Sequence, residues 1–399
     1  MPATFGDRLQ KARKRAGLSQ RTLAAESGVS LSLIRKLEQG ERHDTRLETA
    51  RRLAAALHVP TTLLISAEAT DADPADGDRA APWAAVHAAL DPDVADSRDL
   101  DEAPTVEGVR AGLDLAIAHY TSGNLAAIAA FLPGLIQDVN ALAGLTDRGR
   151  PLRMEVMQIT GRLMTQTRNY AAAEVAFGLA QAELPDELHA AALANNTTWL
   201  LLRRGRLKEA GRLAARWAET LEPKLSRATP EDLSAWGWLL LRTAATASRD
   251  SRPDDAAQAL RLATAAAVTM PPPRPGKTLS RAGFIRRYTR LTVGMQRAEQ
   301  AMVEERPEEV LRVARQVGAK KLPPTVGNRN RHLLDVAHAQ VLVRQHADAM
   351  ETLLLVERDA PEWLPHQRYA KEVLAQIIAK RRTLTGDMRR LADTMRLPL

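Results

Sequence analysis

The stretches GLSQRTLA (Gly17–Ala24) and GVSLSLIRKLEQG (Gly28–Gly40) decide the fold of the N-terminal part of this chain. Each contains a serine, Ser19 in the first and Ser30 in the second, whose hydroxyl can accept a hydrogen bond from the free N–H groups of a first helical turn. Gly28 lies between the two predicted helices, where the chain must turn sharply and a Cβ would obstruct it. Two short capped helices joined by a tight glycine turn predict a helix-turn-helix.

Apolar residues recur at helical spacing within this motif and on both sides of it. Leu23 and Ala24 are expected to face inward on the first helix, and Ile34 and Leu37 on the second. The same spacing predicts further helices over residues 5–16, 46–57 and 61–65. Residues 1–66 are therefore expected to form a bundle of five helices.

The composition of the whole chain favours helices. Apolar residues make up 45% of the 399 residues and aromatic residues only 4%, so the core must consist mainly of Ala, Leu and Val. Alternating apolar and polar runs typical of strands are nearly absent, and we expect an all-α protein with two or more domains. The absence of cysteine excludes disulfides and thiolate metal sites and suits a reducing cytoplasm.

Neither a signal peptide nor a membrane span is expected. The residues after Met1 lack a positively charged start followed by an apolar run. No stretch approaches the roughly eighteen uncharged apolar residues of a transmembrane helix. We therefore expect a cytoplasmic protein with no membrane partner.

The net charge of +8 is unevenly distributed along the chain. Residues 1–66 carry a net charge of +6, residues 67–107 carry −10, and the remainder carries +12. The basic N-terminal segment suits contact with phosphates. The acidic segment, residues 67–105, is predicted to be a flexible linker with a short helix near 82–90, which can dock through Trp83, Val86 and Leu90.

Residues 5–66 carry a set of spaced positions that extends beyond the two motif helices. These are Arg8, Leu9, Arg13, Gly17, Leu18, Ser19, Gln20, Leu23, Ala24, Gly28, Val29, Ser30, Ile34, Leu37, Glu38 and Gly40, followed by Leu53 to Pro60 and by Leu64. This pattern resembles the Cro/phage-repressor (XRE) family of helix-turn-helix domains. The resemblance implies a five-helix, lambda-repressor-like DNA-binding domain over residues 1–66.

By this resemblance, the second helix of the motif presents its outward face to the major groove of double-stranded DNA. Arginine can grip guanine there, whereas leucine offers only apolar contact, for instance to a thymine methyl. Gln20 would hold a phosphate or an outer base, and Arg13 and Glu38 stand where the family pairs an arginine with a glutamate. The predicted DNA contacts are Gln20, Arg21, Ser30, Leu31, Ser32, Arg35, Lys36, Arg42 and Arg46.

Two considerations limit this assignment. Taken alone, Arg35 and Lys36 would be read as solvated helix charges, and Asp44, beside His43 in the following loop, is unfavourable next to phosphate. Arg35 and Lys36 are also the one strong polar pair available for base readout. Part of the sequence specificity is therefore expected to come from DNA shape.

Residues 106–399 are predicted to form helical pairs. In the clearest unit, Gly161 is followed by Tyr170, Ala173, Phe177, Ala180 and Pro185, at intervals of 9, 3, 4, 3 and 5 residues. Small residues let the two helices of a hairpin approach closely, aromatic residues fill the space beside them, and proline ends the second helix. This spacing resembles the tetratricopeptide (TPR) repeat, and we expect a degenerate, TPR-like α-solenoid of about six hairpins, closed by an amphipathic helix within 384–399.

In TPR folds, the first helix of each hairpin lines a concave groove. Carried over by position, the resemblance implies that amide, hydroxyl, indole and guanidinium groups of two such helices face a ligand. The alternative is that they lie on a wet surface or, for Trp199, in the core. These candidate ligand-binding residues are Gln158, Arg162, Thr165, Gln166, Asn195, Trp199 and Arg203.

No catalytic constellation, metal-ligand spacing or glycine-rich phosphate loop appears, so we expect no enzyme activity, metal or cofactor. The combination resembles actinobacterial XRE–TPR regulators and, more distantly, peptide-sensing quorum regulators. It implies a transcription regulator that binds operator DNA as a homodimer and whose TPR-like domain mediates dimerisation and senses a peptide or small molecule. The alternative is a TPR protein–protein adaptor whose DNA binding is incidental or recruits a partner.

Overall fold

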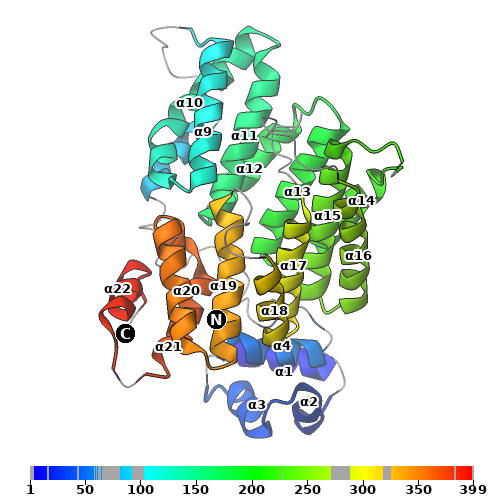
Figure 1. The fold of residues 1–399 in the computed structure, drawn as a ribbon, viewed down its shortest axis with the longest axis vertical. Helices are drawn as coiled ribbons and strands as arrows, with labels where there is room; N and C mark the ends of the chain where they lie inside the picture. The colour runs from blue at the N-terminus through cyan, green and yellow to red at the C-terminus, as the bar shows by residue number, and fades with distance from the viewer. Residues whose placement is uncertain are drawn as a thin grey trace.

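The computed structural model describes residues 4–15, 18–42, 45–57, 59, 61, 64, 81–91, 103–224, 226–270, 288–317, 325–381 and 383–397. Every regular element within these residues is a helix, as the composition predicts. Four short helices form an N-terminal head, which lies against one end of a larger helical body (Figure 1).

The head consists of α1 (Phe5–Arg15), α2 (Gln20–Ser27), α3 (Leu31–Glu38) and α4 (Leu47–Ala56). Its core is formed by the predicted inward positions, and Leu9, Leu23, Ile34, Leu37 and Leu53 are all 0% exposed. Of the predicted fifth helix, only Thr61 and Leu64 lie within the described residues. Leu64 is buried in the same core, and its carbonyl accepts a hydrogen bond of 2.9 Å from Nε of Arg8.

The two helices of the motif begin at the predicted caps. The Ser19 hydroxyl accepts from the backbone N–H of Thr22 at 3.0 Å, and the Ser30 hydroxyl accepts from that of Leu33 at 3.3 Å. The reason given above for Gly28 is wrong, because a Cβ at this position would meet nothing within 4 Å. Glycine is instead favoured by the backbone, which has a φ of 65° in the left-handed region.

The predicted helix in the acidic connector belongs with the body. It comprises a 3₁₀ turn, η1 (Ala81–Trp83), and α7 (Ala84–Ala89). Trp83, Val86 and Leu90 are buried in the body's first hydrophobic core, where α7 packs on α10 (Leu125–Leu145). The remaining acidic residues, 67–80 and 92–102, lie outside the described residues.

The body is built from consecutive helical hairpins. The first helix of each hairpin packs against the first helix of the next, so these helices form an inner layer and their partners an outer one. The hairpins in the described residues are α9 (Val106–Ser122) with α10, α11 (Gly149–Gln166) with α12 (Tyr170–Gln181), α13 (Glu187–Arg203) with α14 (Leu207–Thr220), α15 (Pro230–Arg249) with α16 (Pro253–Thr269), α17 (Arg290–Val303) with α18 (Pro307–Val317), and α19 (Val326–Leu342) with α20 (His346–Asp359).

Each of these hairpins turns in the same way, although their sequences differ. One residue adopts a left-handed conformation, a single residue follows, and the second helix begins. This conformation satisfies the carbonyl groups at the end of the first helix. The left-handed residues, with φ between 58° and 80°, are Gly123, Arg168, Gly205, Ser251, Glu305 and Arg344.

The inner layer closes on itself. Helix α19 of the last hairpin contacts α9 of the first. The Val326 side chain lies beside Gly123, where an added Cβ would come within 3.2 Å, and the Glu362 carboxylate accepts a hydrogen bond of 2.8 Å from the Ala126 N–H. The series of hairpins therefore curls around a central space.

The C-terminal end covers the last hairpin. After η3 (Leu364–His366), α21 (Arg368–Ile378) packs on α19, and α22 (Gly386–Thr394) follows. Met388, Leu391 and Met395 of the predicted closing helix are buried in this core, and the helix is shorter than the sequence indicates.

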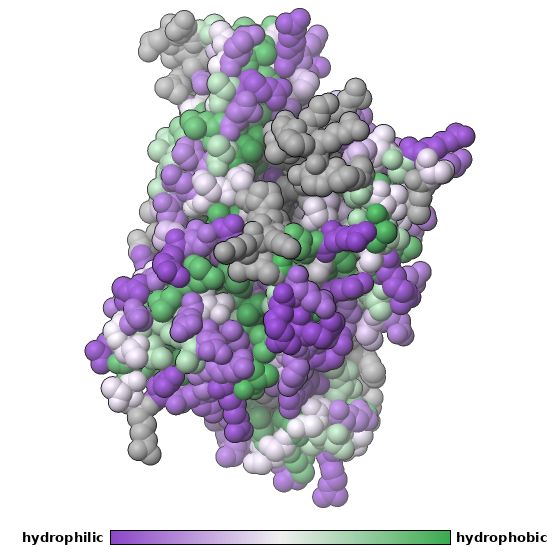
Figure 2. Space-filling model, in the orientation of Figure 1, coloured by the Kyte–Doolittle hydropathy of each residue, from purple (hydrophilic) through white to green (hydrophobic). Residues whose placement is uncertain are grey.

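The sequence predicts no membrane span, but one described helix, α10, is long and apolar enough to cross a membrane by length and composition alone. Core helices of globular proteins pass the same test. In this structure seven of its apolar side chains are buried in the first core of the body. On the face shown in Figure 2, hydrophobic residues are interspersed with hydrophilic ones from one end of the molecule to the other.

The close approach of α11 and α12 gives a test of the packing. A Cβ on Gly161 would lie 2.3 Å from the ring of Phe177, whereas a Cβ on Gly178 of α12 would meet nothing within 4 Å. We expect Gly161→Ala to lower the free energy of unfolding by about 1–3 kcal/mol through overpacking. The same change at exposed Gly178 should raise it by about 0.5–1 kcal/mol, because alanine favours the helix.

Chemical denaturation of the full chain, followed by circular dichroism, measures both changes. Equal effects of the two substitutions would contradict the packing argument.

Candidate nucleic-acid interface

Helix α3 presents a polar face to solvent beside its buried apolar face. Ser32, Arg35 and Lys36 are exposed and, three and four residues apart, share one side of the helix. Ser30 is exposed at the N-cap, and Leu31 is half-buried. The structure thus brings the predicted contacts of this helix onto one surface that can approach the major groove.

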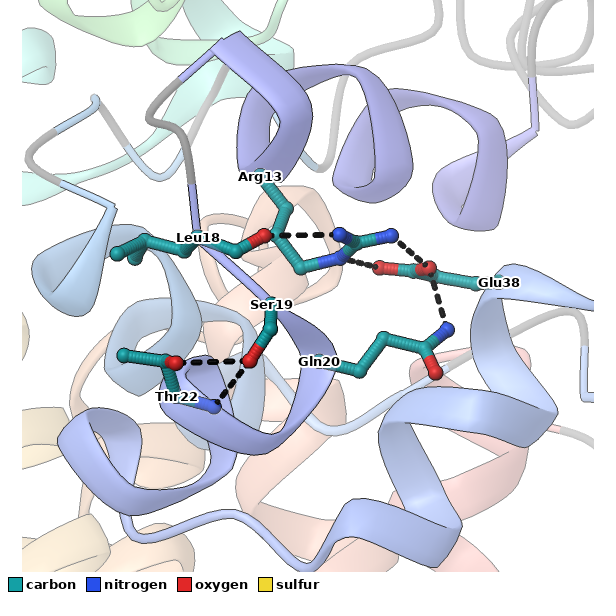
Figure 3. A network of polar contacts seen from close by, with 6 residues as sticks. All are labelled: Arg13, Leu18, Ser19, Gln20, Thr22 and Glu38. Carbon is teal, nitrogen blue, oxygen red and sulfur yellow. Dashed lines mark hydrogen bonds and ion pairs between the residues drawn. The ribbon is translucent and has the colours of Figure 1, made fainter.

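A buried ion pair fixes α3 to α1 (Figure 3). Nε of Arg13 lies 2.7 Å from Oε1 of Glu38, and Nη2 lies 2.7 Å from Oε2, so the contact is bidentate. Nη1 of Arg13 also donates to the Leu18 carbonyl at 2.9 Å. The hydrogen bonds to Glu38 raise the pKa of Arg13, which keeps its charge. This contact fixes the orientation of α3 relative to α1.

Gln20 joins this network rather than pointing away from it. Its Nε2 donates to Oε2 of Glu38 at 2.8 Å (Figure 3). The amide therefore links the start of α2 to the end of α3. The expected phosphate or base contact has to be made by the part of the amide that Glu38 does not hold.

The remaining predicted contacts are exposed arginines. Arg21 lies on α2, and Arg42 and Arg46 lie on the segment between α3 and α4. Arg42 and Arg46 also border a cleft between the head and the body. His43 and Asp44, next to them, fall outside the described residues.

The orientation of the head leaves the predicted DNA contacts of α3 facing away from the body. In Figure 1, α2 and α3 lie on the far side of the head, and α1 and α4 face the body. Nε of Arg52, on α4, donates to the Glu305 carboxylate at 2.9 Å, and this bond raises the pKa of Arg52. The exposed face of α3 is therefore not covered by the body.

Three of the predicted ligand-binding residues meet at a central cavity of about 360 Å³ within the ring of inner helices. They are Gln166 of α11 and Trp199 and Arg203 of α13. The Gln166 amide oxygen accepts a hydrogen bond of 3.2 Å from the Tyr120 hydroxyl, and Nε of Arg203 is buried with no hydrogen-bond partner in the described structure.

The other predicted ligand-binding residues are buried among neighbouring helices and do not line this cavity. Each of them has at least one polar contact within the protein. The Gln158 amide oxygen accepts from Asn196 at 3.2 Å, the Arg162 guanidinium lies 4.5 Å from the centre of the Tyr120 ring, Thr165 donates to the Gly161 carbonyl at 2.7 Å, and Asn195 accepts from Arg242 at 3.0 Å.

The charged residues that dominate the cavity are not among the predicted ligand-binding residues. Arg242 and Arg249 of α15, Glu299 of α17 and Arg331 and Asp335 of α19 all line it. One sequence signal could have found them. Arg242 and Arg249 are seven apart, and Arg331 and Asp335 four apart, on the first helices of their hairpins, so each pair lies on one face.

The described residues contain no group of three or more His, Cys, Asp or Glu that could hold a metal ion. The buried His332 beside the cavity has its pKa lowered to about 4 by burial and is neutral at pH 7. The charged groups that line this cavity are arginines and carboxylates.

Comparison with known proteins bears on the head. No curated protein and no solved structure matches the chain. A family model described as a helix-turn-helix matches residues 9–64, from α1 to the buried Leu64, and supports an XRE-type helix-turn-helix. The TPR-like resemblance of the body stays a prediction. The N-terminal part of this chain is a helix-turn-helix domain of the kind found in DNA-binding regulators.

Proposed function

We propose that this chain is a sequence-specific, DNA-binding transcription regulator that acts as a homodimer in the cytoplasm. The observation that carries the proposal is the exposed polar face of α3, held to α1 by the Arg13–Glu38 pair and directed away from the body. Helices held in this way read base edges in the major groove. One head reads one half-site, so two chains are needed to read a palindromic operator.

The body, in this proposal, is a TPR-like domain that mediates dimerisation and senses a peptide or small-molecule signal. No chemical reaction is assigned to it. Its cavity and the cleft beneath the head have Arg168 and Arg368 in common as lining residues. A ligand that moved these two arginines would change the surface on which the head rests, and so the population of DNA-binding arrangements.

Footprinting on the chain's own promoter region, combined with the mass of the protein in solution, tests this function. A dimer that protects a defined operator supports the regulator. A monomer that binds DNA without sequence preference would instead support an adaptor that docks a partner protein.

We expect the double substitution Arg35→Ala with Lys36→Ala to weaken operator binding by at least tenfold. Loss of a base contact costs about 1–3 kcal/mol, and each lost phosphate contact lowers the slope of affinity against salt concentration by about 1. Fluorescence anisotropy over a series of salt concentrations measures both quantities. The matched control removes the same charge from exposed Lys208 and Arg212 on the outer helix α14 and should leave both unchanged.

A second prediction concerns the buried pair. Glu38→Gln leaves the Arg13 guanidinium buried without its carboxylate, which should destabilise the head by about 3 kcal/mol. Amide hydrogen exchange in α1–α3 should accelerate accordingly and operator affinity should fall.

The control is Glu26→Gln, the same change at an exposed position of α2. Unchanged exchange in Glu38→Gln would show that the pair does not hold α3 in place.

A further inference from the structure

The central cavity carries an excess of positive charge. Two carboxylates line the cavity, and neither is fully available to neutralise the remaining arginines. Glu299 forms an ion pair with Arg249. Burial, together with Glu299, raises the pKa of Asp335 to about 7, so Asp335 is partly protonated at neutral pH. Against them stand the lining arginines Arg168, Arg203, Arg242, Arg249, Arg331 and Arg368.

Most of these arginines form no ion pair with the described residues, whereas Arg249 pairs with Glu299 and Arg368 pairs with Glu372. Within the described structure, Arg168, Arg203 and Arg331 have no side-chain hydrogen bond and no ion pair, and Arg242 donates to the neutral amide of Asn195. Such an arrangement is costly, because half-buried guanidinium groups lose hydration without gaining a counter-charge.

The arginines are also close enough to affect one another. Burial lowers the pKa of Arg331 to about 10, with further lowering by Arg203 and Arg242. Burial likewise lowers the pKa of Arg242 to about 10. Glu299 attracts Arg242 and Arg331, but it already forms an ion pair with Arg249, so a further anion between these arginines would relieve the repulsion that remains.

The shape and lining of the cavity limit what this anion can be. A volume of about 360 Å³ lies in the range of small-molecule sites, and the contact between α19 and α9 closes the ring against a long extended chain. Guanidinium forks match the oxygens of phosphate. The half-buried rings of Trp199 and Tyr170 also line the cavity and offer flat apolar surfaces to an organic group.

We propose that the central cavity binds a small organic phosphate, with Arg203, Arg242 and Arg331 holding the phosphate and Trp199 lying against the organic part. The proposal names the ligand class of the sensing domain, and its regulatory meaning rests on the function proposed above. Binding itself does not depend on DNA and is measured without it.

The test uses the full chain with AMP, pyrophosphate and adenosine as probes, at matched ionic strength. Isothermal titration calorimetry gives affinity, and a thermal melt gives the shift in Tm. We expect AMP and pyrophosphate to bind and to raise Tm, and adenosine, which lacks the phosphate, to do neither. Quenching of tryptophan fluorescence by AMP that Trp199→Phe abolishes would place the organic part beside Trp199, because Trp238 also lines the cavity.

The substitution Arg331→Gln distinguishes a binding role from a structural role. It should weaken AMP binding at least tenfold and, because Arg331 is half-buried and forms no ion pair in the described part of the chain, should leave Tm without ligand equal or higher. Arg203→Gln should behave in the same way. Arg261→Gln, at an exposed position on the outer helix α16, is the matched control and should leave AMP affinity unchanged.

Three outcomes would overturn the proposal. One is the failure of AMP and pyrophosphate to bind beyond a sodium chloride control. Another is AMP binding that Arg331→Gln and Arg261→Gln weaken equally. The third is arginine-dependent binding of a short glutamate peptide with no binding of either phosphate. None of these measurements includes DNA. Their failure would therefore leave the DNA-binding function, which footprinting tests, unaffected.

Discussion

The architecture of the body depends on one backbone constraint, the left-handed residue at each hairpin turn. Because every described hairpin turns at one such residue followed by a single linking residue, the first helices all lie on the same side and pack against one another. Glycine meets this requirement at Gly123 and Gly205, and other residues accept the strain at Arg168, Ser251, Glu305 and Arg344. An inner layer made only of first helices follows, and its closure between α9 and α19 creates the central cavity.

The head is organised by an interaction of the opposite kind, a specific side-chain pair. A bundle with so few buried residues leaves little energy to fix the angle between helices by packing alone. The bidentate contact of Arg13 and Glu38 fixes the angle between α1 and α3, and Gln20 connects α2 to the same carboxylate. Positive charge therefore has different roles in the two parts of the molecule. In the head, the buried Arg13 is neutralised by Glu38 and the basic side chains of α3 are exposed. In the body, arginines line an internal cavity.

Much of the head could be predicted from the sequence, because its signals are local. The serine caps and the apolar spacing of Leu23, Ile34 and Leu37 each depend on residues close together in the chain. The prediction for Gly28 gave the wrong reason. A glycine required by a left-handed φ and a glycine required by close packing look the same in a sequence. For the cavity, the sequence shows at most that Arg242 and Arg249, and Arg331 and Asp335, share one face of their helices, and not that these faces meet. Arg242 and Arg331 look like ordinary solvated charges, and they become neighbours only through contacts between helices far apart along the chain.

The docking of the connector helix also limits how far the head can travel. Leu64 is buried in the head and Trp83 in the body, so 18 residues join two fixed points. Fully extended, such a tether reaches about 60 Å. A head released from Arg52 and Glu305 therefore stays at millimolar effective concentration around its own body. A weak surface contact suffices to hold the head under these conditions, and a small change in that contact suffices to free it.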